Sequence, residues 1–526
     1  MFILSICTLN WLEGVGQRRK SEDIDVLHYR FELTLSDQTD SISGSSQVTF
    51  TFPKEAKDTL VFDLKSVANG KGMTVKSITN NDERLHFTHS EDRIKIWDIK
   101  SVQINDTTSI KIDYAGIPSD GLIIGQNKFG SRTFFGDNWP NRCHYWLPVV
   151  DHPSDKATCE FVVTAPEKYD VISNGVLEKT KPLGQGKELT HWTQNQPIST
   201  KVMVIGASDF SIESYTSSTG VSLSSWVFPE NEKEGFKDYS DSKHILEFFS
   251  DRLGDYPFDK LAHVQSKTKW GGMENASAIF YSENSITGNG QAKRLIAHET
   301  AHQWFGNSVS ESDWQHVWLS EGFATYLAHL YLEATFGKEA MRLAMIQDKK
   351  KIIEFNQANP YRSIVEEEID NLFLLLNANT YQKASWVLHM LRKSIDDVLF
   401  WEILKSFHEE YKYSNASTAD FISLVNKITG KEYNWFFKQW LYKSGIPKIK
   451  YNWSFKKEKI ELYMQQSNST YNLPMDVRIK YKDESVELTH ITLKSENESF
   501  SIKTKGRPSE VILDPDGWLL AEIEKK

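Results

Sequence analysis

The sequence His298-Glu299-Thr300-Ala301-His302 lies near the middle of the chain, inside a run, 295–305, whose apolar residues recur at helical spacing. Because four residues make about one helical turn, His298 and His302 project from one face and are close enough to share a metal ion. Imidazole nitrogen suits zinc, and catalytic zinc usually takes three protein ligands and a water molecule. Glu299, beside the first histidine, is placed to hold that water and take its proton. The same pattern also occurs in helices that merely carry two histidines, so a third ligand decides between the two interpretations.

The candidate third ligand is Glu321, nineteen positions beyond His302 in the segment Trp318-Leu319-Ser320-Glu321-Gly322-Phe323-Ala324. Ser320 is typical of a helix start, so a second helix could present Glu321 near the histidine pair. The bulky apolar residues on both sides indicate that Glu321 points inward, and a buried carboxylate needs a partner such as a metal ion. The sequence therefore predicts one zinc ion per chain, held by His298, His302 and Glu321.

Two segments together resemble the zinc aminopeptidases related to aminopeptidase N and to the leukotriene-hydrolysing aminopeptidase, which are gluzincins. The first is His298–Asn307 followed by Trp318–Ala324, and the second is Gly271-Gly272-Met273-Glu274-Asn275 upstream. Both occur in the family's order and at its usual separation. The resemblance covers nearly the whole chain, since Arg142–Ala157 is similar to the end of the family's first lobe and Trp440–Pro447 to its passage into a small β lobe.

The resemblance implies roles for several residues outside the zinc ligands. Glu274 matches the glutamate that binds the free α-amine of a peptide. Gly271 and Gly272 leave backbone groups open to an extended substrate, which adds like an edge strand. Met273 would line the first side-chain pocket. Tyr381 resembles the tyrosine that donates a hydrogen bond to the oxyanion of the tetrahedral intermediate.

Two positions depart from the family's pattern. Ala384 stands where the segment that begins at the tyrosine often has glycine. Asp137 stands, counting back from Arg142, where glutamate or glutamine is often found, and its side chain is one methylene shorter. Asp137 either helps to bind the α-amine or caps a turn, because aspartate favours turns. Both interpretations stay open.

The periodicity of apolar residues predicts a multidomain α+β protein with three lobes. Residues 21–211 alternate between apolar and polar, which predicts an antiparallel β domain. Helical periodicity over 212–445 predicts an α-rich catalytic domain, thermolysin-like by resemblance. Alternation returns over 446–526 and predicts a small C-terminal β-sandwich. The large helical domain that many relatives carry beyond this point is expected to be absent, which would leave the site more open.

Composition excludes several classes of function. With 61 basic and 71 acidic residues the formal charge is −10, which argues against a generic nucleic-acid binder. Three cysteines, Cys7, Cys143 and Cys159, provide neither a disulfide scaffold nor a cysteine zinc site. Residues 1–20 are either a signal remnant or an N-terminal arm, which favours export but leaves the localisation open. No segment is long enough for an integral membrane span.

These observations predict a zinc-dependent aminopeptidase that hydrolyses the N-terminal bond of peptides with a free amino terminus. Glu299 acts as general base on the water, and Tyr381 stabilises the oxyanion. One alternative is epoxide hydrolysis at the same zinc, as one relative performs. Another is a catalytically silent peptide-binding relative, which would be expected to lack a ligand or the base.

Overall fold

The computed structural model describes residues 24–53, 59–97, 99 and 104–526, so the expected N-terminal arm at 1–20 and Cys7 lie outside the described residues. The chain divides into two compact units. The first unit contains the described residues up to Ser320 together with Glu368–Leu375 and Lys405–Ser417. The second unit contains Glu321–Glu367, Leu376–Leu404 and Thr418–Lys526.

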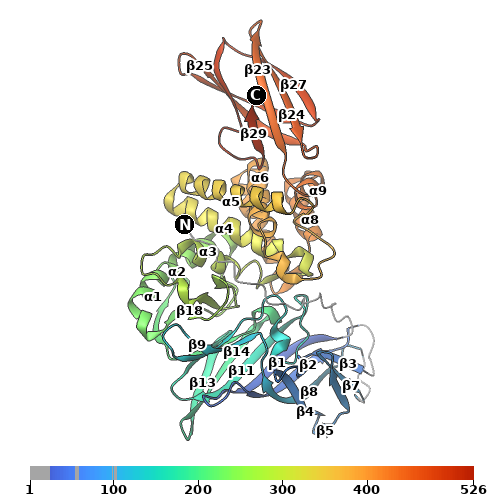
Figure 1. Cartoon of the computed structure of the whole chain (residues 1–526), viewed down its shortest axis with the longest axis vertical. Helices are drawn as coiled ribbons and strands as arrows, with labels where there is room; N and C mark the ends of the chain where they lie inside the picture. Colours follow the sequence, from blue (N-terminus) through green and yellow to red (C-terminus); the bar gives the residue numbers. More distant parts are fainter. Residues whose placement is uncertain (1–23, 54–58, 98, 100–103) are drawn as a thin grey trace. The chain divides into compact units, whose positions relative to one another are not determined.

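An eight-stranded sheet opens the first unit (Figure 1, blue to teal). Its strands are, from one edge to the other, β13 (Val176–Gly184), β14 (Lys187–Ser199), β11 (Lys156–Pro166), β1 (Asp25–Thr34), β2 (Ile42–Thr51), β8 (Thr107–Ile117), β4 (Gly72–Asn80) and β5 (Glu83–Arg84). The alternating residues Tyr29, Phe31 and Leu33 are at most 2% exposed, as their spacing predicts. The N-terminal β lobe is confirmed with one difference, because β1 and β11 run parallel. More than a hundred residues separate these two strands, which is ample for the crossover that a parallel pair needs.

Two smaller sheets accompany the eight-stranded one in the first unit. One contains β12 (Asp170–Ser173), β15 (Ile205–Ser208), β10 (Arg132–Gly136) and β9 (Leu122–Gln126), and the other contains β3 (Thr59–Asp63), β7 (Arg93–Trp97) and β6 (Phe87–Ser90). Asp137 directly follows the end of β10. The position of Asp137 is therefore set by the end of strand β10 in the four-stranded sheet.

A five-stranded mixed sheet in the first unit carries the glycine-rich segment. Its order is β16 (Ser211–Thr216), β17 (Ser222–Val227), β18 (Lys260–Ser266), β20 (Ala278–Ser282) and β19 (Gly272–Met273). The helical periodicity over 212–445 predicted an α-rich domain and did not reveal this sheet. Every residue of β18 is buried, so the strand shows no alternation of apolar and polar residues that would have revealed it. Strand β19 lies at the end of the sheet order and pairs with β20.

Three helices follow or interrupt this sheet: α1 (Glu232–Tyr239), α2 (Ser242–Leu253) and α3 (Lys293–Ala301). Helix α2 is followed by Gly254, whose φ of 94° suits glycine, and it lies in the region where the sequence showed helical periodicity. Helix α3 carries His298, and His302 is its C-terminal cap residue. The histidine pair therefore spans the last turn of a helix.

Helices dominate the first part of the second unit. They are α4 (Trp318–Phe336), whose first three residues belong to the first unit, α5 (Lys338–Ala358), α6 (Ala384–Ile395), α8 (Thr418–Thr429) and α9 (Asn434–Leu441). Helix α7 (Asp397–Tyr411) also continues from the second unit into the first. The predicted α-rich region is confirmed. Among the described residues, no helix combines the length and apolarity needed to cross a bilayer.

Strands form the last part of the second unit (Figure 1, orange to red). One sheet has the order β27 (Asn497–Lys503), β24 (Lys459–Ser467), β23 (Lys448–Lys456) and β29 (Glu522–Lys525), and the other has β26 (Val486–Leu493), β25 (Leu473–Tyr481) and β28 (Pro508–Leu513). Ile449, Leu462 and Val477 are at most 1% exposed, so each sheet buries one face. The predicted C-terminal β region is confirmed.

Candidate functional site

The side chains of His298 and His302 converge. Their Nε2 atoms lie 3.1 Å apart, and their rings are almost perpendicular at 88°. Two nitrogen ligands of a tetrahedral zinc ion, each about 2.0–2.1 Å from the metal, would lie about 3.3 Å apart. The spacing therefore fits one ion shared by both rings.

The ring of His302 is oriented through its other nitrogen. His302 Nδ1 lies 3.1 Å from the carbonyl oxygen of Phe305 and 3.0 Å from Ser320 Oγ. A carbonyl oxygen can only accept, so Nδ1 carries the hydrogen and Nε2 keeps its lone pair for a metal. Gly306, with a φ of 129°, makes this arrangement possible, because a Cβ there would lie 2.5 Å from Ser320 Oγ and 3.0 Å from His302 Nδ1.

Glu321 follows Ser320 in the first turn of helix α4. The ligand atoms of His298, His302 and Glu321 all lie within 4.8 Å of one another. Glu321 is 4% exposed, so its carboxylate is buried as its apolar neighbours predict. Two imidazole nitrogens and one carboxylate oxygen are a donor set suited to catalytic zinc.

Glu299 lies against the glycine-rich segment. A Cβ on Gly272 would lie only 2.3 Å from Glu299 Oε1, so the strand approaches this carboxylate as closely as it does only because residue 272 is glycine. The ligand atoms of Glu274, Glu299 and His302 form a second group within 4.8 Å of one another. Glu274 and Glu299 are 5% and 4% exposed. Two buried carboxylates thus meet beside the histidine pair.

The carboxylate of Asp137 already has partners within the first unit. Its Oδ1 accepts a hydrogen bond from Arg142 at 2.5 Å, and its Oδ2 accepts from Thr268 Oγ1 at 3.3 Å and from the backbone N–H of Lys269 at 3.4 Å. Arg142 also binds Asp120 at 2.7 Å. Burial alone would raise the pKa of Asp120, but the charges of Arg142 and Lys269 outweigh it and lower that pKa. Through its contacts with Thr268 and Lys269, Asp137 holds the backbone segment that precedes Gly271.

Tyr381 lies in a short π-helix, Asn379–Lys383, in the second unit. Such turns are rare and occur frequently at functional sites. The Asn379 side chain donates to two backbone carbonyls of the preceding loop, and Lys383 Nζ donates to the carbonyl oxygen of Lys443 at 2.9 Å. Burial lowers the pKa of Lys383 to about 7. The backbone on both sides of Tyr381 is therefore held in place.

Ala384 is explained by its contact with helix α4. A Cβ on Gly322 would lie 2.5 Å from the Ala384 Cβ, so α4 and α6 approach each other closely at this pair. The departure from the family's glycine adds one methyl group, which the missing side chain of Gly322 accommodates.

Sequence reasoning assigned no separate role to Gln303 and Asn307. Their amide nitrogens both donate to the carbonyl oxygen of Glu274, at 3.0 Å and 2.6 Å. The donors and the acceptor are 29 and 33 residues apart, so nothing in the local sequence could have shown this contact.

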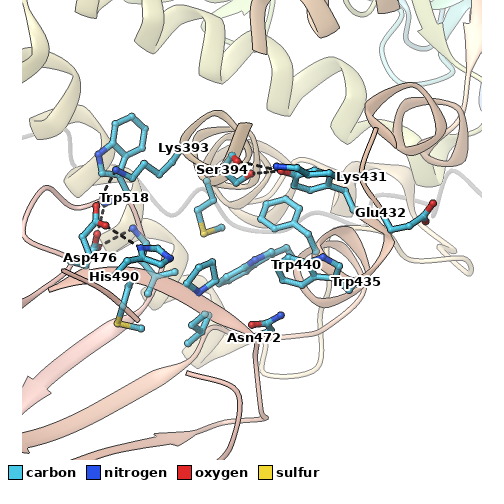
Figure 2. A pocket seen from close by; sticks show the side chains of 18 residues that line it. Lys393, Ser394, Lys431, Glu432, Trp435, Trp440, Asn472, Asp476, His490 and Trp518 are labelled. Atoms are coloured by element: carbon cyan, nitrogen blue, oxygen red, sulfur yellow. Dashed lines mark hydrogen bonds and ion pairs between the residues drawn. The ribbon is translucent and has the colours of Figure 1, made fainter. Parts of the chain in front are cut away.

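A pocket of about 400 Å³ lies within the second unit (Figure 2). Aromatic side chains, including Trp435 and Trp440, line it, and at one end Asp476 pairs with Lys393 and His490 at 3.0 and 3.1 Å. None of the predicted site residues lines this pocket. Its shape therefore does not bear on the predicted zinc site.

Two family descriptions match most of the chain. The description "Peptidase family M1 domain" matches residues 238–440, and "Peptidase M1 N-terminal domain" matches residues 26–202. A probable aminopeptidase 2 of Sulfurisphaera tokodaii is 27% identical over 87% of this chain and 60% of its own length. Aminopeptidase N of Mus musculus is also 27% identical, over 63% of this chain and 37% of its own length.

A solved structure shares the fold. Legionella pneumophila aminopeptidase A in complex with aspartic acid superposes with a TM-score of 0.84 at 19% identity, over 97% of this chain and 60% of that one. The chain thus spans less than two thirds of the length of each of these relatives.

Proposed function

Because this chain belongs to the peptidase M1 family, we propose that it is a zinc-dependent aminopeptidase that removes residues one at a time from the N-termini of peptides. The observation that carries the proposal is the convergence of two ligand groups. His298, His302 and Glu321 form one, and Glu274 and Glu299 join His302 in the other.

The three ligands would hold one zinc ion, which when bound supplies a Lewis acid for the scissile carbonyl and lowers the pKa of a bound water. Glu299 takes the proton from the attacking water and later delivers it to the leaving amine. Its place directly under Gly272 supports this role, because a substrate paired with strand β19 passes over the same carboxylate. Tyr381 donates a hydrogen bond to the oxyanion.

Glu274 pairs with the α-ammonium group of the substrate. A carboxylate at a fixed distance from the metal ligands limits cleavage to the first peptide bond, because only a terminal ammonium can occupy that place. Met273 lines the first side-chain pocket, and Gly271 and Gly272 present backbone groups to the substrate. Asp137 acts through Arg142 and Thr268 by holding the segment before Gly271, since both of its oxygens already accept hydrogen bonds.

The buried carboxylate pair supports peptide hydrolysis over the two alternatives. Epoxide hydrolysis needs no anchor for an α-amine, and a silent binding relative needs no general base. Glu274 and Glu299 lie together at the candidate metal site, and a peptidase uses both. No contact among the described residues favours an epoxide substrate.

A panel of fluorogenic aminoacyl amides with N-acetylated controls tests the proposal. An acetylated substrate forfeits the ion pair between its α-ammonium group and Glu274, a loss of several kcal/mol, so the acetylated substrates should be cleaved at least about a hundredfold more slowly. Zinc content is measured on the same preparation. Comparable cleavage of acetylated peptides at internal bonds would instead identify an endopeptidase.

A further inference from the structure

The backbone of Glu274 is held by two side-chain amides. Gln303 Nε2 and Asn307 Nδ2 both donate to the Glu274 carbonyl oxygen, and both side chains are 0% exposed. Gln303 also accepts, through Oε1, the backbone N–H of Ser277 at 2.8 Å. Gln303 therefore bridges both ends of the turn 274–277 that follows strand β19.

This turn depends on outside contacts for its shape. Ser277 has a φ of 60°, a left-handed conformation that is costly for a residue with a side chain and that persists only where the surroundings impose it. Further hydrogen bonds hold Ser277 in this conformation. Among them, Ser277 Oγ accepts from Gly175 N at 2.7 Å, and the Ser277 carbonyl accepts from Ala262 N at 3.0 Å and from Lys260 Nζ at 3.1 Å. The contact from Gln303 is the one that comes from the metal-binding segment.

Gln303 and Asn307 belong to the same turn as His302. Gln303 is the next residue in the chain, and the backbone N–H of Asn307 donates to the His302 carbonyl oxygen at 3.0 Å. Lys156 Nζ fixes the far side of this turn by donating to the carbonyl oxygens of Asn307 and Ser308 at 2.9 and 2.7 Å. One rigid turn thus presents a candidate zinc ligand and holds the backbone of the candidate amine anchor.

We propose that Gln303 and Asn307 form an amide clamp that sets the distance from the Glu274 carboxylate to the metal ligands, and thereby the preference for ligands with a free α-amine. This inference rests on the proposed function. Both are positioning residues, because they act through the backbone of Glu274. The effect can be large, since a misplacement of about 1 Å can cost on the order of a hundredfold.

The test uses a pair of inhibitors that differ only in the amine: leucine hydroxamate and its desamino analogue, 4-methylpentanohydroxamate. Titration calorimetry on the full zinc-loaded chain gives the ratio of the two dissociation constants. This ratio measures how much the α-amine contributes to binding, and the measurement needs no catalytic turnover. Gln303→Met removes the two hydrogen bonds that the side chain makes to the turn, together with the 3.5 Å one that it accepts from the Tyr256 hydroxyl, at nearly constant volume. It should lower the ratio at least about tenfold, with zinc content unchanged.

Gln466 provides a matched control. It is 1% exposed and braces Tyr471 in the same way, donating to its carbonyl oxygen at 3.0 Å and accepting from its N–H at 2.9 Å. Gln466→Met should lose stability to a similar extent as Gln303→Met but keep the wild-type ratio. A fall in the ratio in Gln303→Met but not in Gln466→Met would therefore exclude a general loss of folding stability as its cause.

The outcomes separate the two proposals. A wild-type chain that binds both hydroxamates equally would overturn the proposed function and the clamp together. A wild-type preference that persists unchanged in Gln303→Met would overturn the clamp alone. If Gln303→Met does not fold, Asn307→Ser removes the 2.6 Å hydrogen bond while keeping Gln303, and the same fall in the ratio is expected.

Discussion

Two missing side chains shape the candidate site. Gly306 leaves room for the hydrogen bonds of His302 Nδ1, and Gly272 leaves room for the Glu299 carboxylate. Gly271, which precedes Gly272, is different, because a Cβ there would meet Leu295 at 3.7 Å, an ordinary contact distance. Of these two adjacent glycines, only Gly272 is therefore required by a close contact.

Gly272→Ala tests the role of Glu299 without altering a charge. The added methyl group would displace the Glu299 carboxylate, so kcat/KM should fall by about a hundredfold or more, the usual contribution of a general base. Metal analysis should show zinc retained. Gly271→Ala should cost far less activity; equal losses in the two variants would contradict the contact with Glu299.

Glu321→Ala and Glu299→Gln should separate metal binding from proton transfer. Glu321→Ala removes one of the three proposed ligands and should lose most zinc together with activity. Glu299→Gln keeps the shape of the side chain, so zinc should remain while turnover falls about a hundredfold or more. Full zinc occupancy in Glu321→Ala would refute the ligand assignment, and near-normal turnover in Glu299→Gln would show that another group activates the water.

The packing of helices α4 and α6 depends on the small pair Gly322 and Ala384. Because a Cβ on Gly322 would lie 2.5 Å from the Ala384 Cβ, Gly322→Ala must push the helices apart. Overpacking of this kind typically costs about 1–3 kcal/mol. Thermal unfolding should therefore show a clear fall in Tm for Gly322→Ala.

The double variant Gly322→Ala/Ala384→Gly is the matched control for this helix contact. It moves the methyl group from one helix to the other, so it should recover part of the lost stability. Recovery is incomplete because glycine inside a helix costs roughly 1 kcal/mol relative to alanine. A double variant no more stable than Gly322→Ala would show that the strain lies elsewhere.

Buried histidines in both units couple the stability of the whole chain to pH. Burial lowers the pKa of His263, in the first unit, and of His389, in the second, to about 3. In the unfolded chain both would titrate near 6.5. Below that pH the unfolded state binds protons that the folded state does not, so stability is present above about pH 6.5 and is lost as pH falls toward 3.

Each histidine should contribute a slope of up to about 1.4 kcal/mol per pH unit in this window. His389→Gln should be less stable near neutral pH, because it loses the stack on Trp518 at 4.2 Å, but its stability should depend less steeply on pH between 6 and 4. Thermal unfolding across this range measures both effects. Parallel curves for the two proteins would show that His389 is protonated in the folded state.

Patterns among neighbouring residues were sufficient for much of the fold and for the centre of the site. Alternation in β1 and helical spacing in α2 and α4 follow from the strand and helix repeats, so they can be read without knowing what each element contacts. The spacing of His298 and His302 predicted their convergence for the same reason. Glu321 was found because its apolar neighbours indicated a buried carboxylate, and it is buried.

The strands and site contacts that the sequence did not predict depend on contacts between residues far apart in the chain. Strand β18 is buried throughout and shows no alternation, and the parallel pairing of β1 with β11 joins segments more than a hundred residues apart. The partners of Asp137 lie up to 132 residues away, and the two amides on Glu274 come from 29 and 33 residues away. A hydrogen bond of this kind depends on where the backbone is placed by the whole core. Only the tertiary structure therefore distinguishes a side chain that touches the ligand from one that holds its neighbour in position.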